Sequence, residues 1–405
     1  MAPGSDAADL PVLDLTQPDW WSEPAVVTAP MLAAGAVAAS VPSFGTVMFL
    51  RFEDCLAAIN DPDLLAMEAR YFELQGWTDG PFVEWIRRNV VMMNPPGHTR
   101  LRSLVSRAFT PRRVAAMEET AQRVADELCD AVDARDGEVE FVGDWARLLP
   151  LRVICSMIGI PRVDTDLMGE WAHGLSVASG MADPDARRLG DEAMTAFNDY
   201  VGEMIAERRT VRSDDLLSDL VEAEEAGDRL SPEELVALVV QLIFAGHETT
   251  QNLLGNGLYR LLGAPDQLEH LRRDPTAIPD AIEEMLRYDP PILFTSRVAR
   301  HDRVISGVPV AADQLIMLNL TAANHDPAHV DDPARFDVRR EDVRHLSFGH
   351  GTHFCLGANL ARLEARVAFQ TILGRYRAIE VTAPGEWTTF TPLRGRARLD
   401  LRMVR

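Results

Sequence analysis

A long helix with almost no polar face constrains the fold of this chain most. The sequence has helical periodicity over Pro232–Leu262, and the stretch Leu235–Ala245 within it is almost wholly apolar. Ser231 and Glu234 fit a capping box around the first-turn proline Pro232, so the start of this helix is well marked. A helix that is apolar on all sides is buried on all sides. The sequence therefore predicts a large core with other helices packed around this one.

Shorter patterns on either side predict a mainly α-helical protein with small β-sheets. Helical spacing of apolar residues recurs at Val114–Val132, Asp191–Arg209 and Leu356–Tyr376. Strand-like runs occur at Thr46–Arg51, Arg297–Ile305 and Gln314–Leu320, and Thr388–Val404 alternates like a hairpin. Since no repeat or Gly/Ser-rich linker divides the chain, residues 1–405 are expected to form a single domain.

The chain is strongly acidic, with 62 Asp and Glu residues against 40 basic ones and a net charge of −22. This balance disfavours nucleic acid and anionic membranes as partners, because both attract basic surfaces. The apolar run Met31–Ala39 is shorter than the ~20 residues of a membrane span. No basic residue precedes Arg51, so the positively charged start of a signal peptide is missing. We therefore expect a cytoplasmic protein.

The middle of the long helix carries residues that are locally unfavourable there. Residues 245–250 read Ala-Gly-His-Glu-Thr-Thr. Gly246 costs about 1 kcal/mol relative to alanine in a helix, and a buried acid such as Glu248 and a buried hydroxyl such as that of Thr249 cost more unless they have partners. Three such choices together are typical of a functional site. The alternative interpretation is structural: Gly246 permits close helix packing, and Glu248 pairs with an arginine.

The four cysteines differ in their surroundings. Cys55, Cys129 and Cys155 lie in apolar helical patterns and are predicted to be inert core thiols. Cys355 lies in a glycine-rich segment, 348–357, directly before a predicted helix. A thiol at a helix N-terminus has a lowered pKa and favours the thiolate, which is a good iron ligand. From local chemistry alone, a haem ligand, a catalytic nucleophile and an inert thiol all remain open for Cys355.

Several motifs resemble those of the cytochrome P450 family. The segment Phe348–Gly357 has every fixed position of the haem-binding signature F-x-x-G-x-x-x-C-x-G, and Ala245–Thr249 resembles the oxygen-binding motif. Glu284–Arg287 resembles E-x-x-R, and Pro333–Phe336 resembles the segment whose arginine joins that pair in the family. Asn94–Arg102 resembles the segment that meets a haem propionate. The matches run from about residue 45 to the end, whereas residues 1–40 and 66–92 match poorly, and the overall likeness is to soluble actinobacterial members of natural-product metabolism.

The resemblance implies a P450 fold with haem b between the long central helix and the cysteine loop. It makes Cys355 the iron ligand, the only metal ligand expected from the protein. Residues expected to contact the haem, including those that pair with its propionates, are Phe348, Gly349, Gly357, Ala245, Gly246, His98, Arg102, Arg297 and His353. Thr249 and Glu248 are the expected catalytic residues, which deliver protons to the reacting oxygen.

The resemblance also places the substrate and the electron donor. The expected substrate-contacting residues are Phe244, Ala245, Leu293, Thr295, Leu393, Val91 and Met92, with residues 70–92 and 170–195 as a variable lid. Aromatic residues in the first lid segment favour an apolar substrate, but they are also typical of ordinary core. Electrons are expected from NAD(P)H through a ferredoxin and its reductase, with a docking patch formed by Arg100, Arg107, Arg113, Arg344 and Arg362.

The resemblance thus predicts a haem-thiolate monooxygenase. It would use O2 and two external electrons to hydroxylate or epoxidise a small apolar molecule, in natural-product biosynthesis. The alternatives are P450-type chemistry of another kind, such as aryl coupling or peroxide-driven oxidation, and a catabolic steroid or terpenoid hydroxylase. A haem-binding sensor without turnover is a further alternative from a different class.

Overall fold

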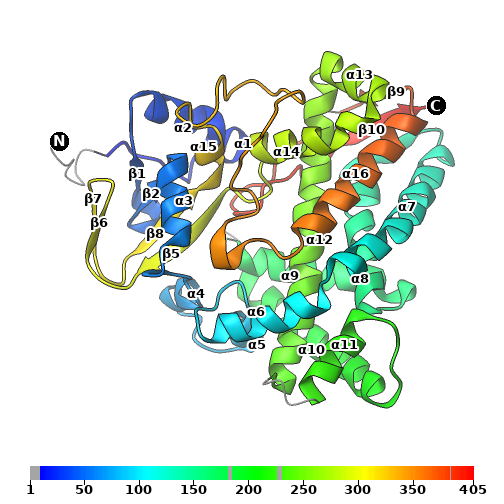
Figure 1. The fold of residues 1–405 in the computed structure, drawn as a ribbon, viewed down its shortest axis with the longest axis horizontal. Coiled ribbons are helices and arrows are strands. Elements are labelled where there is room, and N and C mark those ends of the chain that lie inside the picture. Colours follow the sequence, from blue (N-terminus) through cyan, green and yellow to red (C-terminus); the bar gives the residue numbers. More distant parts are fainter. Residues whose placement is uncertain (1–9, 181–184, 226–229, 384) are drawn as a thin grey trace. The chain divides into compact units, whose positions relative to one another are not determined.

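The long helix predicted from the sequence is helix α12, Pro232–Leu262, with the expected bounds (Figure 1). Its capping box is formed as predicted. The backbone N–H of Glu234 donates to Ser231 Oγ at 3.2 Å, and the backbone N–H of Ser231 donates to Glu234 Oε2 at 2.9 Å. Both bonds satisfy donors that a helix start would otherwise leave unpaired.

The computed structural model describes residues 10–180, 185–225, 230–383 and 385–405. The chain divides into two compact units, and the division passes through helix α12 after Leu254. Unit 1 comprises Met1–Met67, Gly255–Cys355 and Pro384–Leu399, and unit 2 comprises the rest. The single domain expected from the sequence stays a prediction, and each unit is described by itself.

Unit 1 combines short helices with the strands of a mixed sheet. Its helices are α1 (Pro18–Ser22), α2 (Pro24–Ala33), α3 (Phe52–Asn60), α13 (Pro265–Arg273), α14 (Ile278–Tyr288) and α15 (Leu320–Asn324), with 3₁₀ turns η2 (Pro42–Phe44), η5 (Pro275–Ala277) and η6 (Gly351–His353). Its strands are β1 (Ala38–Val41), β2 (Thr46–Phe49), β3 (Leu64–Leu65), β5 (Phe294–Ala299), β6 (Arg303–Ile305), β7 (Val308–Val310) and β8 (Leu315–Asn319).

The main sheet of unit 1 has the strand order β1-β2-β8-β5-β3. Strands β2 and β8 are parallel, with Met48 opposite Met317, and the other neighbours are antiparallel. Helix α3 packs against this sheet beside β8, over a core that includes Phe49, Ile316 and Leu318 (Figure 1). The predicted strand Arg297–Ile305 is two strands, β5 and β6, because the chain turns at residues 300–302.

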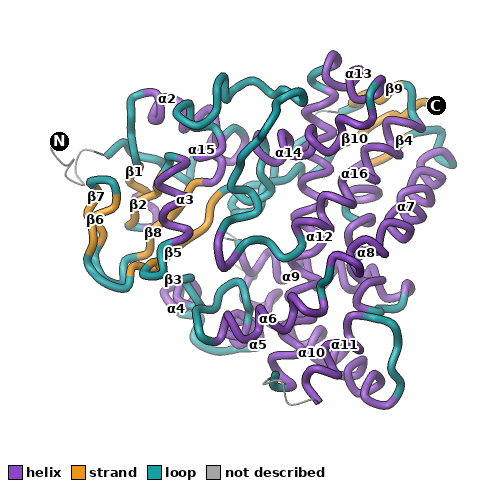
Figure 2. The backbone as a smooth tube through the Cα atoms, viewed as in Figure 1, coloured by secondary structure: helices purple, strands orange, loops and turns teal. Residues whose placement is uncertain are grey.

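Unit 2 consists mainly of helices, with one small sheet (Figure 2). Its helices, besides most of α12, are α4 (Arg70–Leu74), α5 (Pro81–Arg88), α6 (Gly97–Ala108), α7 (Pro111–Asp133), η3 (Val142–Ala146), α8 (Leu148–Ile158), η4 (Arg162–Asp164), α9 (Thr165–Ser179), α10 (Ala186–Thr210), α11 (Leu216–Glu225) and α16 (Ala358–Arg375). Strands β4 (Glu138–Glu140), β9 (Ala378–Val381) and β10 (Asp400–Val404) form the sheet, in the order β4-β10-β9.

Helix pairs form the core of unit 2. Helix α7 packs against α8 and α16, and α9 packs along α10. Trp145 of η3, Phe197 of α10 and Phe369 of α16 are fully buried. The predicted mainly α-helical fold with small sheets is therefore confirmed. Within the described residues, no helix has both the length and the apolar character needed to cross a membrane.

The predicted hairpin over Thr388–Val404 is only partly correct. A short antiparallel pairing joins Trp387 to Arg396, and Thr388 N donates to Gly395 O at 2.9 Å. The end of the chain pairs elsewhere, because β10 lies between β9 and β4 and Leu401 is opposite both Val381 and Val139. Alternation alone predicted strand residues but not their partners.

Candidate functional site

The segment around Cys355 in unit 1 is a tight, hydrogen-bonded loop. The Cys355 N–H donates to Phe348 O at 2.8 Å, and the Gly349 N–H donates to Leu346 O at 2.8 Å. Gly349 and Gly351 have φ angles of 66° and 63°, which lie in the left-handed region that favours glycine. A Cβ at Gly351 would lie 2.6 Å from Asn60 Oδ1. The glycines in this motif are thus required by the turn itself.

Cys355 is the exposed cysteine of this chain, and the other three are buried. Burial raises the pKa of Cys155 to about 12 and also raises the pKa of the Cys55 and Cys129 thiols. These three are inert core thiols, as predicted. Helix α16 begins at Ala358, just after Cys355 in the chain. Cys355 therefore has the accessibility that an iron ligand or a nucleophile needs.

The Cys355 loop is anchored to the elements of unit 1 beneath it. His350 Nδ1 lies 2.8 Å from Asn60 Oδ1 at the end of α3. Leu346 N donates to Asn324 Oδ1 at 2.8 Å, and Ser347 Oγ donates to Leu286 O at 2.6 Å on α14. These bonds fix the start of the loop on α3, α15 and α14, and α14 is the helix that carries the E-x-x-R pair.

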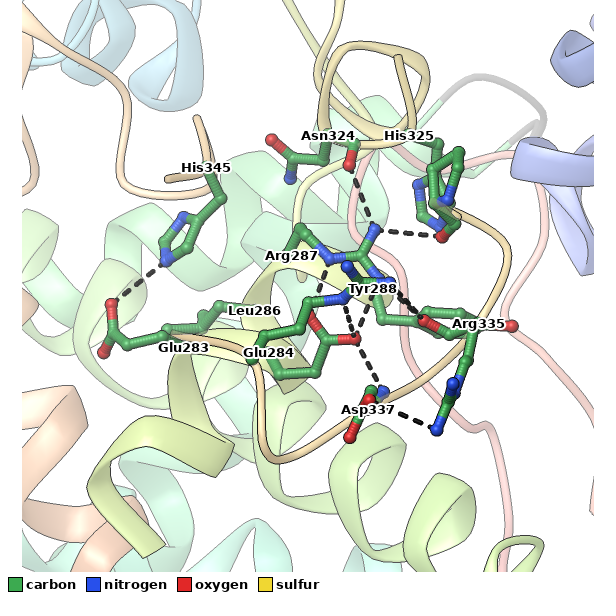
Figure 3. A network of polar contacts seen from close by, with 12 residues as sticks. Glu283, Glu284, Leu286, Arg287, Tyr288, Asn324, His325, Arg335, Asp337 and His345 are labelled. Carbon is green, nitrogen blue, oxygen red and sulfur yellow. Dashed lines mark hydrogen bonds and ion pairs between the residues drawn. The ribbon is translucent and has the colours of Figure 1, made fainter. Parts of the chain in front are cut away.

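The E-x-x-R pair is a fully buried ion pair on helix α14 (Figure 3). Arg287 donates from Nε to Glu284 Oε2 at 2.7 Å and from Nη2 to Glu284 Oε1 at 2.8 Å. Its remaining N–H groups donate to the backbone carbonyls of Asn324, Pro333 and Arg335. Residues three apart share one helix face, which brings the pair together. The guanidinium nitrogens of Arg287 and both carboxylate oxygens of Glu284 thus have hydrogen-bond partners, which a buried ion pair requires.

The prediction that the arginine of Pro333–Phe336 joins this pair is wrong. The Arg335 side chain is mostly exposed and pairs with Asp337 at 3.4 Å, and only its backbone carbonyl accepts a bond from Arg287. Arg340 contacts Glu284 instead, from Nε at 3.3 Å. Sequence reasoning missed Arg340 because the loop doubles back after Phe336, which no local pattern indicates.

Residues 245–250 of α12 lie in unit 2, and Glu248 is one of the residues there whose pKa is strongly shifted. Glu248 Oε1 accepts a bond from Ser176 Oγ of α9 at 2.9 Å, while Oε2 is buried and has no hydrogen-bond partner among the described residues. Burial raises the pKa of Glu248 to about 7, and the Ser176 bond only partly opposes this. At neutral pH this carboxyl can therefore both give and take a proton.

The residues on either side of Glu248 test the structural interpretation of the motif. A Cβ at Gly246 would lie 3.0 Å from Ile154 Cγ1, so this glycine does permit close packing against α8. The acid pairs with Ser176 and not with an arginine, so that half of the interpretation is wrong. Thr249 Oγ1 donates to Ala245 O at 3.0 Å. Ala245 is exposed and Thr249 partly exposed, on a helix whose other residues are largely buried.

Four residues were predicted to pair with the haem propionates, and one of them, Arg297, is a buried cation. It is 7% exposed on β5, and its guanidinium donates to Ser296 O at 2.8 Å and lies 3.4 Å from Thr295 Oγ1. No ion pair to Arg297 occurs among the described residues, and burial is the one cause that lowers its pKa. A buried cation without an acid has donors to spare for a carboxylate ligand.

The other predicted propionate residues lie on α6 and in η6. His98 and Arg102 are one helical turn apart on α6; His98 is buried, and Arg102 is partly buried. Burial, and then the Arg102 charge, lower the pKa of His98. His353 ends the 3₁₀ turn η6 before Cys355 and is partly buried. The roles of all four residues stay predictions.

The predicted substrate residues lie in both units. In unit 1, Leu293 is buried and Thr295 and Leu393 are partly buried; Leu393 is bridged to Ile292 and Leu293 N donates to Pro392 O at 2.9 Å. In unit 2, Val91 is half exposed, Met92 is partly buried, and the ring of Phe244 lies edge-on to Trp85 at 5.6 Å.

The aromatic residues of the first lid segment are largely core. Phe82 and Trp85 are buried, and the Phe82 ring packs against the rings of Phe72, Trp77 and Trp85. They therefore say little about the substrate. The second lid segment includes residues 181–184, which lie outside the described residues.

The proposed basic docking patch is weaker than its sequence suggests. Arg100 pairs with Glu234, with one bond of 3.0 Å, and Arg113 pairs with Asp219. Arg344 is exposed, and the side chain of Arg107 lies outside the described residues. Two of the five arginines thus have their charge compensated within the chain.

Comparison with known proteins assigns the chain to a family. Residues 180–391 match the family model described as Cytochrome P450. The chain is 36% identical to Cytochrome P450 CYP107DY1 of Priestia megaterium, over 83% of this chain and 84% of that protein. It is 39% identical to 6-deoxyerythronolide B hydroxylase of Saccharopolyspora erythraea, over 78% of each chain. The crystal structure of CalO2 matches with a TM-score of 0.91 and 30% identity, over 97% of this chain and 99% of that one.

The residues of the site fit the haem that this family implies. The exposed thiol of Cys355 lies in a loop shaped by glycines, and the buried Arg297, which has no acidic partner in the part of the chain that the structure describes, is available for a propionate. Glu248, whose pKa is raised to about 7, and Thr249, which has a hydroxyl, follow one another on α12. The comparisons and these features together show that the chain belongs to the cytochrome P450 family of haem-dependent monooxygenases.

Proposed function

We propose that this enzyme hydroxylates or epoxidises a mostly apolar natural product. It would use haem b bound to Cys355, O2, and two electrons from NAD(P)H delivered by a ferredoxin and its reductase. The observation that carries the proposal is the pair Glu248–Thr249 on α12, in a chain whose exposed cysteine lies in a glycine-shaped loop. The haem supplies the activation of O2, and the chain supplies the ligand, the protons and the pocket.

The thiolate of Cys355 would hold the iron, and the loop would keep it in place. The Cys355 N–H is already bonded to Phe348 O. The positive φ angles of Gly349 and Gly351 disfavour any residue with a side chain at these two positions. Such a loop presents the sulfur in one orientation without a rearrangement on binding. Arg297 would hold one propionate by a charge-assisted bond, and His98, Arg102 and His353 would complete the set.

Glu248 would supply protons, and Thr249 would hold the oxygen that receives them. Since the pKa of Glu248 is raised to about 7, its carboxyl is partly protonated at neutral pH. Ser176 fixes one of its oxygens, which leaves the other able to exchange a proton with water or with a neighbouring hydroxyl. The Thr249 hydroxyl donates to Ala245 O, so its oxygen lone pairs remain able to accept a hydrogen bond.

The substrate class rests on the relatives and on the apolar residues of the predicted wall. Two relatives are named 6-deoxyerythronolide B hydroxylase and Vitamin D(3) 25-hydroxylase, the latter at 38% identity over 88% of this chain. Phe244, Ala245, Leu293, Leu393 and Val91 are apolar, which suits a mostly apolar substrate. A panel of macrolactones, steroids and terpenoids, screened for displacement of iron-bound water in the haem spectrum, would identify the class.

Peroxide-driven oxidation is the second candidate, and the Glu248–Thr249 pair favours the O2-dependent reaction over it. The test is a reconstituted assay with ferredoxin, reductase and NADH, in which NADH, hydrogen peroxide and product are measured together. We expect Thr249→Ala to consume NADH while releasing mainly peroxide. Thr249→Ser, which keeps the hydroxyl, should restore product formation.

A second comparison isolates the role of Glu248. Ser176→Ala removes the bond to Glu248, whereas Ser179→Ala removes a hydroxyl of the same helix that bonds only its own helix, at Leu175 O. We expect the first change to shift the pH dependence of product formation and the second to leave it unchanged. Normal coupling in Thr249→Ala, or full activity with peroxide and none with O2, would contradict the proposal.

A further inference from the structure

The histidine that precedes the Cys355 loop has both of its ring nitrogens engaged. The His345 side chain is only 4% exposed. Its Nδ1 accepts the backbone N–H of Ser347 at 3.2 Å, and its Nε2 lies 3.2 Å from Glu283 Oε2 on helix α14 (Figure 3). Neither partner is among the residues expected to hold the haem or to deliver protons. The pair nevertheless stands at the entry of the loop that carries the expected iron ligand.

The two bonds select one form of the His345 ring. A backbone N–H can only donate, so Nδ1 is without a proton where it faces Ser347. An ionised carboxylate can only accept, so Nε2 carries the proton where it faces Glu283. The ring is therefore the neutral tautomer with its proton on Nε2. Since the partner of one ring nitrogen decides the state of the other, Glu283 keeps Nδ1 available as an acceptor.

The bond from Ser347 N reaches the stretch of backbone that holds Cys355. Ser347 is followed directly by Phe348, whose carbonyl accepts the Cys355 N–H at 2.8 Å. The ring of His345 also contacts that of Phe348, with the two centroids 5.8 Å apart. Because Ser347 and Phe348 are adjacent in the chain, a displacement of the Ser347 backbone is passed on to the carbonyl that closes the loop.

Ser347 is held on two sides, and His345 supplies one of them. Its hydroxyl donates to Leu286 O at 2.6 Å and accepts from Asn324 Nδ2 at 3.0 Å, which fixes the side chain. The bond to His345 fixes the backbone of the same residue. Ser347 is buried, and an N–H left there without an acceptor is costly, so the backbone would move to find another partner.

We propose that His345 is a positioning residue for the iron ligand and that Glu283 acts through it. His345 Nδ1 would hold the backbone at Ser347 and Phe348, and Glu283 would keep the ring in the tautomer that can do so. The inference rests on the proposed ligation of the haem iron by Cys355. It assigns to this pair the direction in which the sulfur meets the iron, and not the stability of the fold.

Asparagine and glutamine at position 345 separate the two ring nitrogens. His345→Asn places a carbonyl oxygen near the position of Nδ1, where it can accept the N–H two residues ahead, as asparagine does in many turns. His345→Gln places an amide N–H near the position of Nε2 and leaves Ser347 N without its acceptor. Both variants lose the ring and its contact with Phe348, so a role in packing alone predicts equal effects.

Two properties of the holoprotein report how the sulfur meets the iron: the iron–thiolate stretching band in resonance Raman spectra and the midpoint potential of the haem iron. We expect His345→Gln to shift both, and His345→Asn to stay close to the wild type. The reduced carbon monoxide complex of His345→Gln should lose its long-wavelength band about two- to tenfold faster, as expected for one lost hydrogen bond. Glu283→Gln, which keeps an acceptor for Nε2, should resemble the wild type.

His301→Gln is the matched control, because His301 is an exposed histidine that lies 3.9 Å from Asp63. It should change neither the stretching band nor the potential. Should His345→Gln fail to fold, Glu283→Ala tests the same role, since it removes the selection of the tautomer and leaves Ser347 intact. We expect an intermediate shift of both properties in Glu283→Ala.

The outcomes separate this inference from the ligation on which it rests. A wild-type holoprotein without an iron–thiolate band would overturn both. If the wild type has the band, unchanged spectra and potential in His345→Gln, or in Glu283→Ala where that variant replaces it, overturn the positioning role alone. Equal changes in His345→Asn and His345→Gln also overturn it, because they would show that the ring acts by packing.

Discussion

Removal of the Glu284 carboxylate should be among the most damaging single changes in unit 1. Glu284 and Arg287 are both fully buried, and Glu284 accepts four bonds, two from Arg287, one from Asp337 N at 2.9 Å and one from Arg340. Glu284→Ala would leave a buried guanidinium with only backbone carbonyls for partners. Breaking one side of such a pair costs about 3–5 kcal/mol, a large part of the roughly 5–15 kcal/mol that stabilises a typical folded protein.

The neighbouring Glu283 is the matched control for this change. It pairs with His345 at 3.2 Å and is 24% exposed, so Glu283→Ala should cost about 1 kcal/mol or less. Urea unfolding of the holoprotein, followed by tryptophan fluorescence, measures both. The double variant Glu284→Leu/Arg287→Met should be less destabilised than Glu284→Ala, because no buried charge remains. If Glu284→Ala costs no more than Glu283→Ala, the buried pair does not have the role assigned to it.

Three further changes test other parts of the structure. Gly202→Ala, at a position of α10 with open space around it, should stabilise the folded protein by about 0.5–1 kcal/mol. Gly246→Ala should not bring this gain, because its new methyl group would press against Ile154. Equal thermal midpoints for the two variants would refute that contact. Burial raises the pKa of Glu364 well above 4.5, so the folded state binds more protons and stability falls as pH rises above about 4.5. Glu364→Gln should flatten this fall in denaturant titrations between roughly pH 5 and pH 8, because in that range the unfolded state loses the Glu364 proton more readily than the folded state. An unchanged slope would argue against this account of Glu364. Arg297→Leu should speed haem loss to a scavenger about 10- to 100-fold, whereas Arg300→Leu, at an exposed pair with Asp63, should not; equal rates would remove Arg297 from the propionate site.

The sequence was sufficient to predict features with a strong local signal. Helix α12 has its predicted bounds because its cap and its apolar run are both local patterns. The buried and exposed cysteines were also separated correctly, since their neighbours differ in kind. The glycine-rich segment 348–357 was recognised from its composition, and two of its glycines have positive φ.

Features that depend on distant residues were missed. Ser176 is 72 residues from Glu248 in the chain, and no pattern marks it as the partner. Arg340 replaced the predicted Arg335 beside Glu284, because a loop without regular structure decides which arginine turns inward. The end of the chain pairs with β4 and β9, since strand partners are set by tertiary packing and not by alternation.

Ligation of the haem iron by Cys355 is tested most directly by the carbon monoxide spectrum of the reduced protein. The wild-type chain should give the long-wavelength Soret band of a thiolate-ligated carbonyl complex. Cys155→Ser, a change at a buried thiol, should keep that band, whereas Cys355→Ser should lose it while the protein remains folded by circular dichroism. A folded Cys355→Ser variant that keeps the long-wavelength band would contradict the account.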